Sequence, residues 1–107
     1  MLPRGYVDIV SIGGYCPVQA DGTIGGNPFY FRARQDYWTL TIAKPGDDPV
    51  DACLLYGQQP SQAIYHHRQD YGPEGQHTAG YMSLQEARRF IRTCAAAFYL
   101  EQGGKSR

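Results

Sequence analysis

Between residues 18 and 42, apolar and polar side chains alternate with a period of two in three successive segments. Neighbouring side chains of a strand point to opposite faces, so each segment is predicted to be a strand with one apolar face. Turn-forming residues at 25–27 and 35–36 separate the segments. The pattern predicts an antiparallel meander over residues 15–42, buried on one face. Its apolar positions are Val18, Ala20, Ile24, Phe29, Phe31, Ala33, Trp38, Leu40 and Ile42.

A second pattern predicts an amphipathic helix over residues 83–102. Ser83 and Glu86 form a capping box, in which the Ser83 hydroxyl accepts from the Glu86 amide and the Glu86 carboxylate returns a bond. Gly103 is the expected end of the helix, which leaves residues 103–107 as a tail. The helical spacing of apolar residues predicts a buried stripe of Leu84, Ala87, Ile91, Cys94, Ala95 and Phe98.

The remaining segments complete one predicted domain over residues 1–107, a typical domain size. Residues 1–14 are an N-terminal arm or an edge strand, and the pattern does not choose between them. Residues 44–62 are predicted to be a loop region, in which residues 50–56 form a helical turn or a strand. Residues 63–71 are predicted to be a further strand. The expected fold is therefore α+β: an antiparallel meander of about four strands packed against one C-terminal amphipathic helix.

The charge balance narrows the classes of partner. Ten basic and ten acidic residues give a formal net charge of zero, which favours neither a general polyanion binder nor an acidic DNA mimic. Eight of the ten basic residues are arginine, and there are nine tyrosines. Both types are enriched in binding hot spots. No segment resembles a signal peptide or a membrane span, and three widely spaced cysteines suit a reducing compartment, so we expect a cytoplasmic protein.

Two surfaces are candidates for binding a partner. The polar face of the meander carries the Tyr–Arg patch, which comprises Tyr30, Arg32, Arg34 and Tyr37. The exposed face of the helix carries the arginine triplet of Arg88, Arg89 and Arg92. Either surface would suit a protein partner, and the arginine triplet would suit an acidic one. Aromatic residues beside arginines on a sheet also suit single-stranded RNA. The alternative for both is an ordinary solvated face.

The spacing of the cysteines and histidines gives little support for a catalytic or metal site. The cysteines Cys16, Cys53 and Cys94 form no closely spaced pair, and His66 and His67 would point to opposite faces of a strand. We therefore expect no metal site and no cofactor. An enzyme that uses Cys16 with His66 or His67 stays an alternative, although no nucleophile motif surrounds a cysteine. No catalytic residue is predicted.

Residues 17–24, residues 28–34 and Trp38 resemble a family of small uncharacterised bacterial and prophage proteins, as do residues 79–82 leading into Glu86 and Ala87. The resemblance covers most of residues 15–98 and carries no known activity. It implies a mobile-element or host-defence setting, in which small phage proteins such as anti-CRISPR proteins act by occluding a larger machine.

These observations favour a small non-enzymatic protein-binding module, with inhibition of a host defence complex as the role that the resemblance implies. A single-stranded nucleic-acid-binding domain and a small cysteine-dependent enzyme are the alternatives. The expected partner is a protein or protein complex, with nucleic acid as the second class and no membrane. The oligomeric state is open, and a homodimer is compatible with the sequence.

Overall fold

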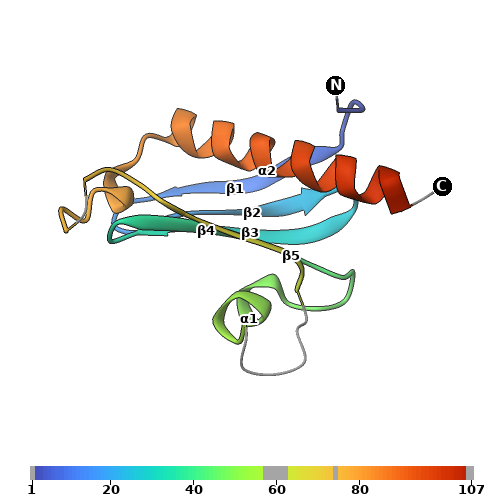
Figure 1. The fold of residues 1–107 in the computed structure, drawn as a ribbon, viewed down its shortest axis with the longest axis horizontal. Helices are drawn as coiled ribbons and strands as arrows, with labels where there is room; N and C mark the ends of the chain where they lie inside the picture. The colour runs from blue at the N-terminus through green and yellow to red at the C-terminus, as the bar shows by residue number, and fades with distance from the viewer. Residues whose placement is uncertain (1, 57–62, 74, 106–107) are drawn as a thin grey trace.

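The computed structural model describes residues 2–56, 63–73 and 75–105. It has an α+β fold in which five antiparallel strands lie side by side in their order along the chain (Figure 1). The strands are β1 (Val7–Gly14), β2 (Val18–Ile24), β3 (Asn27–Arg34), β4 (Tyr37–Ala43) and β5 (Ala63–Asp70). The sequence predicted about four strands. The additional one is β1, so the segment left open as an arm or an edge strand is an edge strand.

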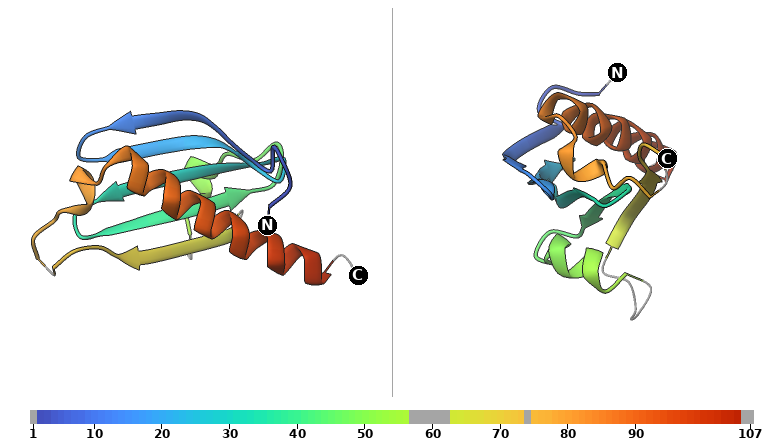
Figure 2. Two further views of the ribbon diagram at one scale, coloured as in Figure 1. Left: turned by 90° about the horizontal axis from the view of Figure 1, so that it is seen from above. Right: turned by 90° about the vertical axis from the view of Figure 1, so that its left-hand side faces the viewer.

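Three helical segments accompany the sheet: α1 (Pro49–Leu54), the 3₁₀ turn η1 (Ala79–Tyr81) and α2 (Leu84–Lys105). Helix α2 lies diagonally across one face of the sheet, here called the core face (Figure 2). Helix α1 lies against the opposite face, here called the outer face (Figure 1). The sheet is therefore the middle layer of three, although α1 is too short to cover the whole outer face.

The predicted strand alternation is confirmed on the core face. Phe31 pairs with Ala20 on one side and with Leu40 on the other, and all three side chains are buried. The turn between β2 and β3 uses Gly25 and Gly26 at φ of 60° and 83°, which suits a two-residue hairpin. Burial of these apolar rows fixes the register, because a one-residue slip would expose all of them.

Helix α2 contributes the buried stripe that the sequence predicted, with one exception. Ala87, Ile91, Cys94, Ala95 and Phe98 are buried against the sheet. Leu84 is 37% exposed, because it occupies the first position of the helix rather than the middle of the contact.

Both ends of α2 differ in part from the prediction. Ser83 Oγ accepts from the Glu86 amide at 3.0 Å, as expected for the capping box. A Glu86 carboxylate oxygen, however, accepts from the Tyr71 hydroxyl at 2.6 Å, so this side chain ties the helix to the segment after β5. The helix continues past Gly103 to Lys105, so the prediction of a tail was wrong for residues 103–105. Residues 106–107 lie outside the described chain.

The outer face departs most from the sequence prediction. Within the loop region predicted at 44–62, the Asp48 side chain accepts from the Val50 amide at 2.9 Å and caps α1, with Pro49 in its first turn. Because α1 packs on β3 and β4, Thr41 is 0% exposed and Thr39 is 8% exposed. The expectation of a meander buried on one face only was therefore wrong. Residues 57–62 lie outside the described chain.

Replacement of Phe31 by alanine tests the core assignment. Phe31 is 0% exposed and packs beside Trp38, with ring centroids 5.5 Å apart. We expect Phe31→Ala to lower the free energy of unfolding by about 3–5 kcal/mol, measured by urea denaturation monitored by circular dichroism. The control Val10→Ala removes a side chain that is 71% exposed and should change it by less than about 0.5 kcal/mol. Equal effects of the two variants would contradict the assignment.

Candidate binding cleft on the outer face

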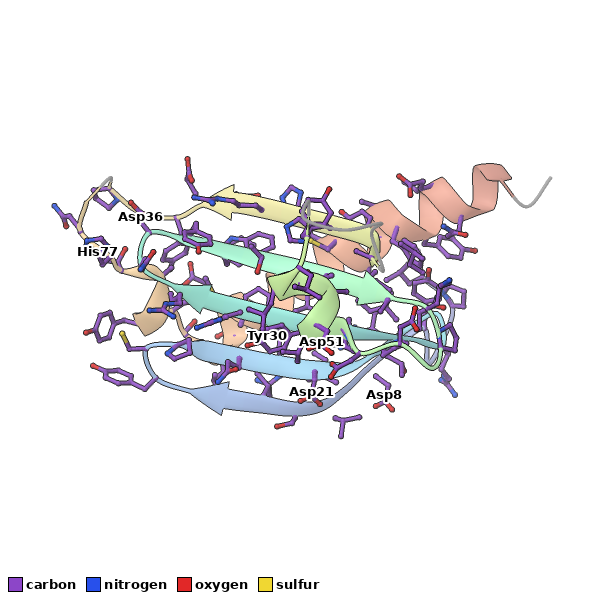
Figure 3. All side chains as sticks on the ribbon, turned by 90° about the horizontal axis from the view of Figure 1, so that it is seen from below. Asp8, Asp21, Tyr30, Asp36, Asp51 and His77 are labelled. Carbon is purple, nitrogen blue, oxygen red and sulfur yellow. The ribbon has the colours of Figure 1, made fainter. Side chains whose placement is uncertain are left out.

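Beside α1, the outer face contains a cleft of about 420 Å³. We call it the basic cleft, and the side chains that give it its chemistry are Arg32, Arg34, Tyr37, Cys53, Tyr56, His66 and Arg68. Strands β3, β4 and β5 supply its floor, and the end of α1 supplies one wall. Figure 3 shows this face, with α1 lying across the strands.

Strand register gathers the arginines of the cleft. Arg32 and Arg34 are two residues apart on β3, so they point to the same face. Arg32 lies opposite Thr39 on β4, and Thr39 lies opposite Arg68 on β5. Arg32 and Arg68 therefore belong to one row across three strands, with their backbones about 10 Å apart.

These guanidinium groups have no carboxylate partner within the described residues. Arg68 instead lies over the Tyr37 ring, with its Cζ 3.8 Å from the ring centroid. Arg32 Nε is buried without a hydrogen-bond partner in the described chain. A buried donor left unpaired costs about 1–3 kcal/mol, so an acceptor that entered the cleft would recover part of this energy.

The charged residues are distributed unevenly over the outer face. Asp8, Asp21 and Asp51 lie toward the β1 side of this face (Figure 3). The arginines lie toward β3 to β5, and Asp36 and Asp70 border a neighbouring hollow that Arg68 shares. The outer face therefore carries charges of both signs, and its arginines are concentrated around the basic cleft.

An aromatic stack forms one side of the cleft. The Tyr56 and His66 rings are stacked, with centroids 3.9 Å apart and an interplanar angle of 15°. His66 Nδ1 is 2.9 Å from Thr41 Oγ1, and Cys53 Sγ is 3.7 Å from Thr39 Oγ1. Burial lowers the pKa of His66, and the neighbouring His67 lowers it further. The neutral imidazole is therefore favoured, and the arginines supply the positive charge of the cleft.

The structure brings together most of the predicted Tyr–Arg patch but not all of it. Arg32, Arg34 and Tyr37 line the basic cleft. Tyr30 was predicted to be on the open surface, which is wrong: it is 8% exposed beneath α1, and its hydroxyl donates to Gln19 Oε1 at 2.6 Å.

Arg68, His66 and Tyr56 were absent from the predicted site. Alternation along β5 places His66 and Arg68 on one face, so the sequence could have predicted that these two side chains lie together. The pairing of β5 with β4 was not predictable in this way, because the two strands are far apart in the sequence.

The arginine triplet is a separate surface. Arg88, Arg89 and Arg92 are exposed on α2, which lies on the other side of the sheet from α1 (Figure 1). They border a shallow, open depression along the helix. The two predicted binding surfaces therefore cannot form one continuous site.

The cysteine–histidine arrangement considered from the sequence does not assemble. Cys16 lies in the turn between β1 and β2, where its amide donates to Gly80 O at 2.8 Å. His66 and His67 are on β5, three strand spacings or about 14 Å from β2. His66 points to the outer face toward Thr41, and His67 packs near Trp38 on the core face. Cys53, rather than Cys16, shares a cleft with His66.

Comparison of the chain with protein-family models, with curated proteins and with solved structures gave no match. The resemblance to small prophage proteins therefore stays a prediction. In the described part of the chain, none of the helices has the length and apolar character required to cross a membrane.

The half-buried His66 should make the free energy of unfolding depend on pH. Its pKa is lowered in the folded protein, so the unfolded chain binds more protons as the pH falls below about 6.5. We expect the free energy of unfolding to be highest above this pH and to fall as the pH drops toward the folded-state pKa. Urea denaturation between about pH 7.5 and 5 measures this dependence.

The variants His66→Gln and His77→Asn isolate the contribution of His66. The first should flatten the pH dependence over that range. The second changes an exposed histidine outside the cleft and should leave the dependence intact. Parallel pH profiles of the wild type and His66→Gln would contradict a lowered pKa of His66 in the folded protein.

The three thiols should react at different rates with iodoacetamide. Cys16 is exposed, Cys53 is partly buried and Cys94 is buried. Burial raises the pKa of Cys94 to about 11, although a hydrogen bond with Tyr65 opposes this. At neutral pH its thiolate fraction should be on the order of 100-fold below that of an ordinary thiol. Mass spectrometry of the native protein should show labelling first at Cys16 and last at Cys94, and the reverse order would contradict the assignment.

Proposed function

We propose that this protein is a non-enzymatic binding module whose basic cleft receives an acidic segment of a partner protein. The observation that carries the proposal is the row of unpaired guanidinium groups on the outer face, together with the buried and unpaired Arg32 Nε. Arginine binds carboxylates through two parallel hydrogen bonds, and such charge-assisted bonds are stronger than neutral ones. A carboxylate in the cleft would supply both the negative charge and the missing acceptor.

The aromatic residues favour an acidic protein segment over single-stranded nucleic acid. Bases stack on aromatic faces that are open to solvent. Here one face of Tyr37 is covered by Arg68, one face of Tyr56 is covered by His66, and Tyr30 is buried. The zero net charge also gives a nucleic acid little long-range attraction. Single-stranded nucleic acid is therefore the second candidate, with the same cleft as its site.

The biological setting is part of the proposal and has different support. The resemblance of residues 15–98 to small bacterial and prophage proteins supports a cytoplasmic, phage-derived or mobile-element protein. In that setting, the partner is a component of a host defence complex that presents an acidic surface, and the protein inhibits it by occlusion. The small size of the domain and the absence of a predicted catalytic residue suit that role.

Binding of a labelled acidic peptide tests the proposal. We would titrate the protein into a fluorescein-labelled peptide of alternating Glu and Gly, and measure fluorescence anisotropy. The double variant Arg34→Ala/Arg68→Ala removes two exposed cations from the cleft and should weaken binding at least about tenfold. Its free energy of unfolding should change by about 1 kcal/mol or less, because the interaction that it removes is the stacking of Arg68 on Tyr37.

The matched control is Arg88→Ala/Arg92→Ala, which removes the same charge from α2. It should leave binding nearly unchanged, and a loss confined to this control would move the site to the arginine triplet. Oligothymidylate and a peptide of alternating Lys and Gly complete the panel. Tight binding of oligothymidylate, with no binding of the acidic peptide, would favour the nucleic-acid function. Equal loss in both double variants would indicate non-specific charge attraction and contradict the proposal.

A further inference from the structure

A second cavity, of about 280 Å³, lies on the core side of the sheet between β5 and α2. Helix α2 crosses the strands diagonally, so it does not run along the whole of the edge strand β5 (Figure 2). The side chains that matter for its chemistry are Trp38, His67, Gln69, Arg89, Phe90 and Thr93. The basic cleft opens on the other face of the sheet, so the two sites are separate.

Trp38 gives this cavity an unmet hydrogen-bonding requirement. The side chain is 1% exposed, and its Nε1 is buried without a hydrogen-bond partner in the described chain. Buried indole N–H groups usually find an acceptor, because leaving one unpaired costs about 1–3 kcal/mol. A ligand acceptor that reached this indole N–H would therefore gain the binding free energy of the missing hydrogen bond.

The walls of the cavity are suited to a flat ring. Phe90 is stacked on Trp38 with centroids 4.8 Å apart, and the His67 ring lies 5.3 Å from Trp38. The cavity is slightly smaller than the usual ligand pocket of about 300–1,000 Å³, which limits an occupant to one or two fused rings. Arg89 contributes a cation, since it has no ion pair within the described residues.

We propose that this cavity binds a compact aromatic carboxylate. Its ring packs between β5 and the Phe90 side of α2, one carboxylate oxygen accepts from Trp38 Nε1–H, and Arg89 balances the charge. Trp38 Nε1 is covered by its surroundings, so a lining side chain rotates on entry. Gln69 has this freedom, because it is exposed on the edge strand, and its side-chain contact among the described residues is 3.3 Å between its Oε1 and His67 Nε2.

The chain itself provides the reporter for this site. Trp38 is its one tryptophan, so a ¹H–¹⁵N correlation spectrum contains one indole cross-peak that needs no further assignment. We would titrate benzoate, 2-naphthoate and indole-3-carboxylate into the labelled protein. At least one should shift the indole cross-peak saturably, with the indole proton moving downfield as the N–H gains an acceptor. Benzamide, which keeps an acceptor but lacks the charge, should bind about three- to tenfold more weakly than benzoate.

Three variants separate specific binding from a general effect. Ala97→Phe places a ring at the exposed α2 side of the cavity and should weaken binding at least about tenfold, with Thr93→Leu as a second filling variant should the first not fold. Arg89→Gln should weaken carboxylate binding, whereas Arg92→Gln, one turn along the same helix but outside the cavity, should not.

Two results would overturn the proposal. One is that none of the three carboxylates shifts the indole cross-peak saturably at concentrations up to about 5 mM. The other is that folded Ala97→Phe and Thr93→Leu bind as well as the wild type. The double variant Arg34→Ala/Arg68→Ala should leave these titrations unchanged, so failure here and failure of the acidic-peptide proposal can be distinguished.

Discussion

β4 is buried on both of its faces, and this double burial organises the rest of the molecule. On the core face, Trp38, Leu40 and Ile42 belong to one hydrophobic core with the buried residues of α2, and on the outer face Thr39 and Thr41 lie beneath α1. β4 lies in the middle layer of three. It pairs with β3 on one side and β5 on the other, and a helix covers part of each of its two faces. Because α1 is short and α2 is oblique, neither layer covers its face completely. The two cavities lie where coverage ends, one beside α1 and the other beside β5.

The unpaired donors coincide with these cavities. Within the described chain, the buried side-chain atoms without a hydrogen-bond partner are Arg32 Nε and Trp38 Nε1. Arg32 lines the basic cleft, and Trp38 lines the cavity between β5 and α2. Native proteins satisfy most buried polar groups, so each exception calls for a physical reason. The reason we propose is the same in both places: the missing acceptor belongs to a ligand, a protein carboxylate in one cavity and a small aromatic carboxylate in the other.

The sequence predicted the features that strand and helix periodicity determine. It missed the features that depend on α1, which forms the layer over the outer face. Alternation along residues 18–42 identified the core face. Helical spacing identified the five buried residues of the α2 stripe but wrongly added Leu84, which is exposed. The same alternation placed Tyr30 on an open surface, since a period of two says which face a side chain occupies and nothing about what covers that face. Helix α1 has six residues, too few for a periodic signal, and only the Asp48-Pro49 cap marked its start. Arg32, Arg34 and Tyr37 were found because they share a hairpin, whereas Arg68 joins them through a pairing between strands that are distant in sequence.

The most direct test of the three-layer arrangement is a nuclear Overhauser measurement of the contacts between α1 and the outer face. The arrangement predicts cross-peaks between the rings of Tyr56 and His66, whose centroids are 3.9 Å apart, and between Ala52 and the side chains of β4. It also predicts helical chemical shifts over residues 49–54. Random-coil shifts in this segment, with no such cross-peaks and with solvent-exposed Thr39 and Thr41, would contradict it. The outer face would then be an open sheet, and the basic cleft would not exist.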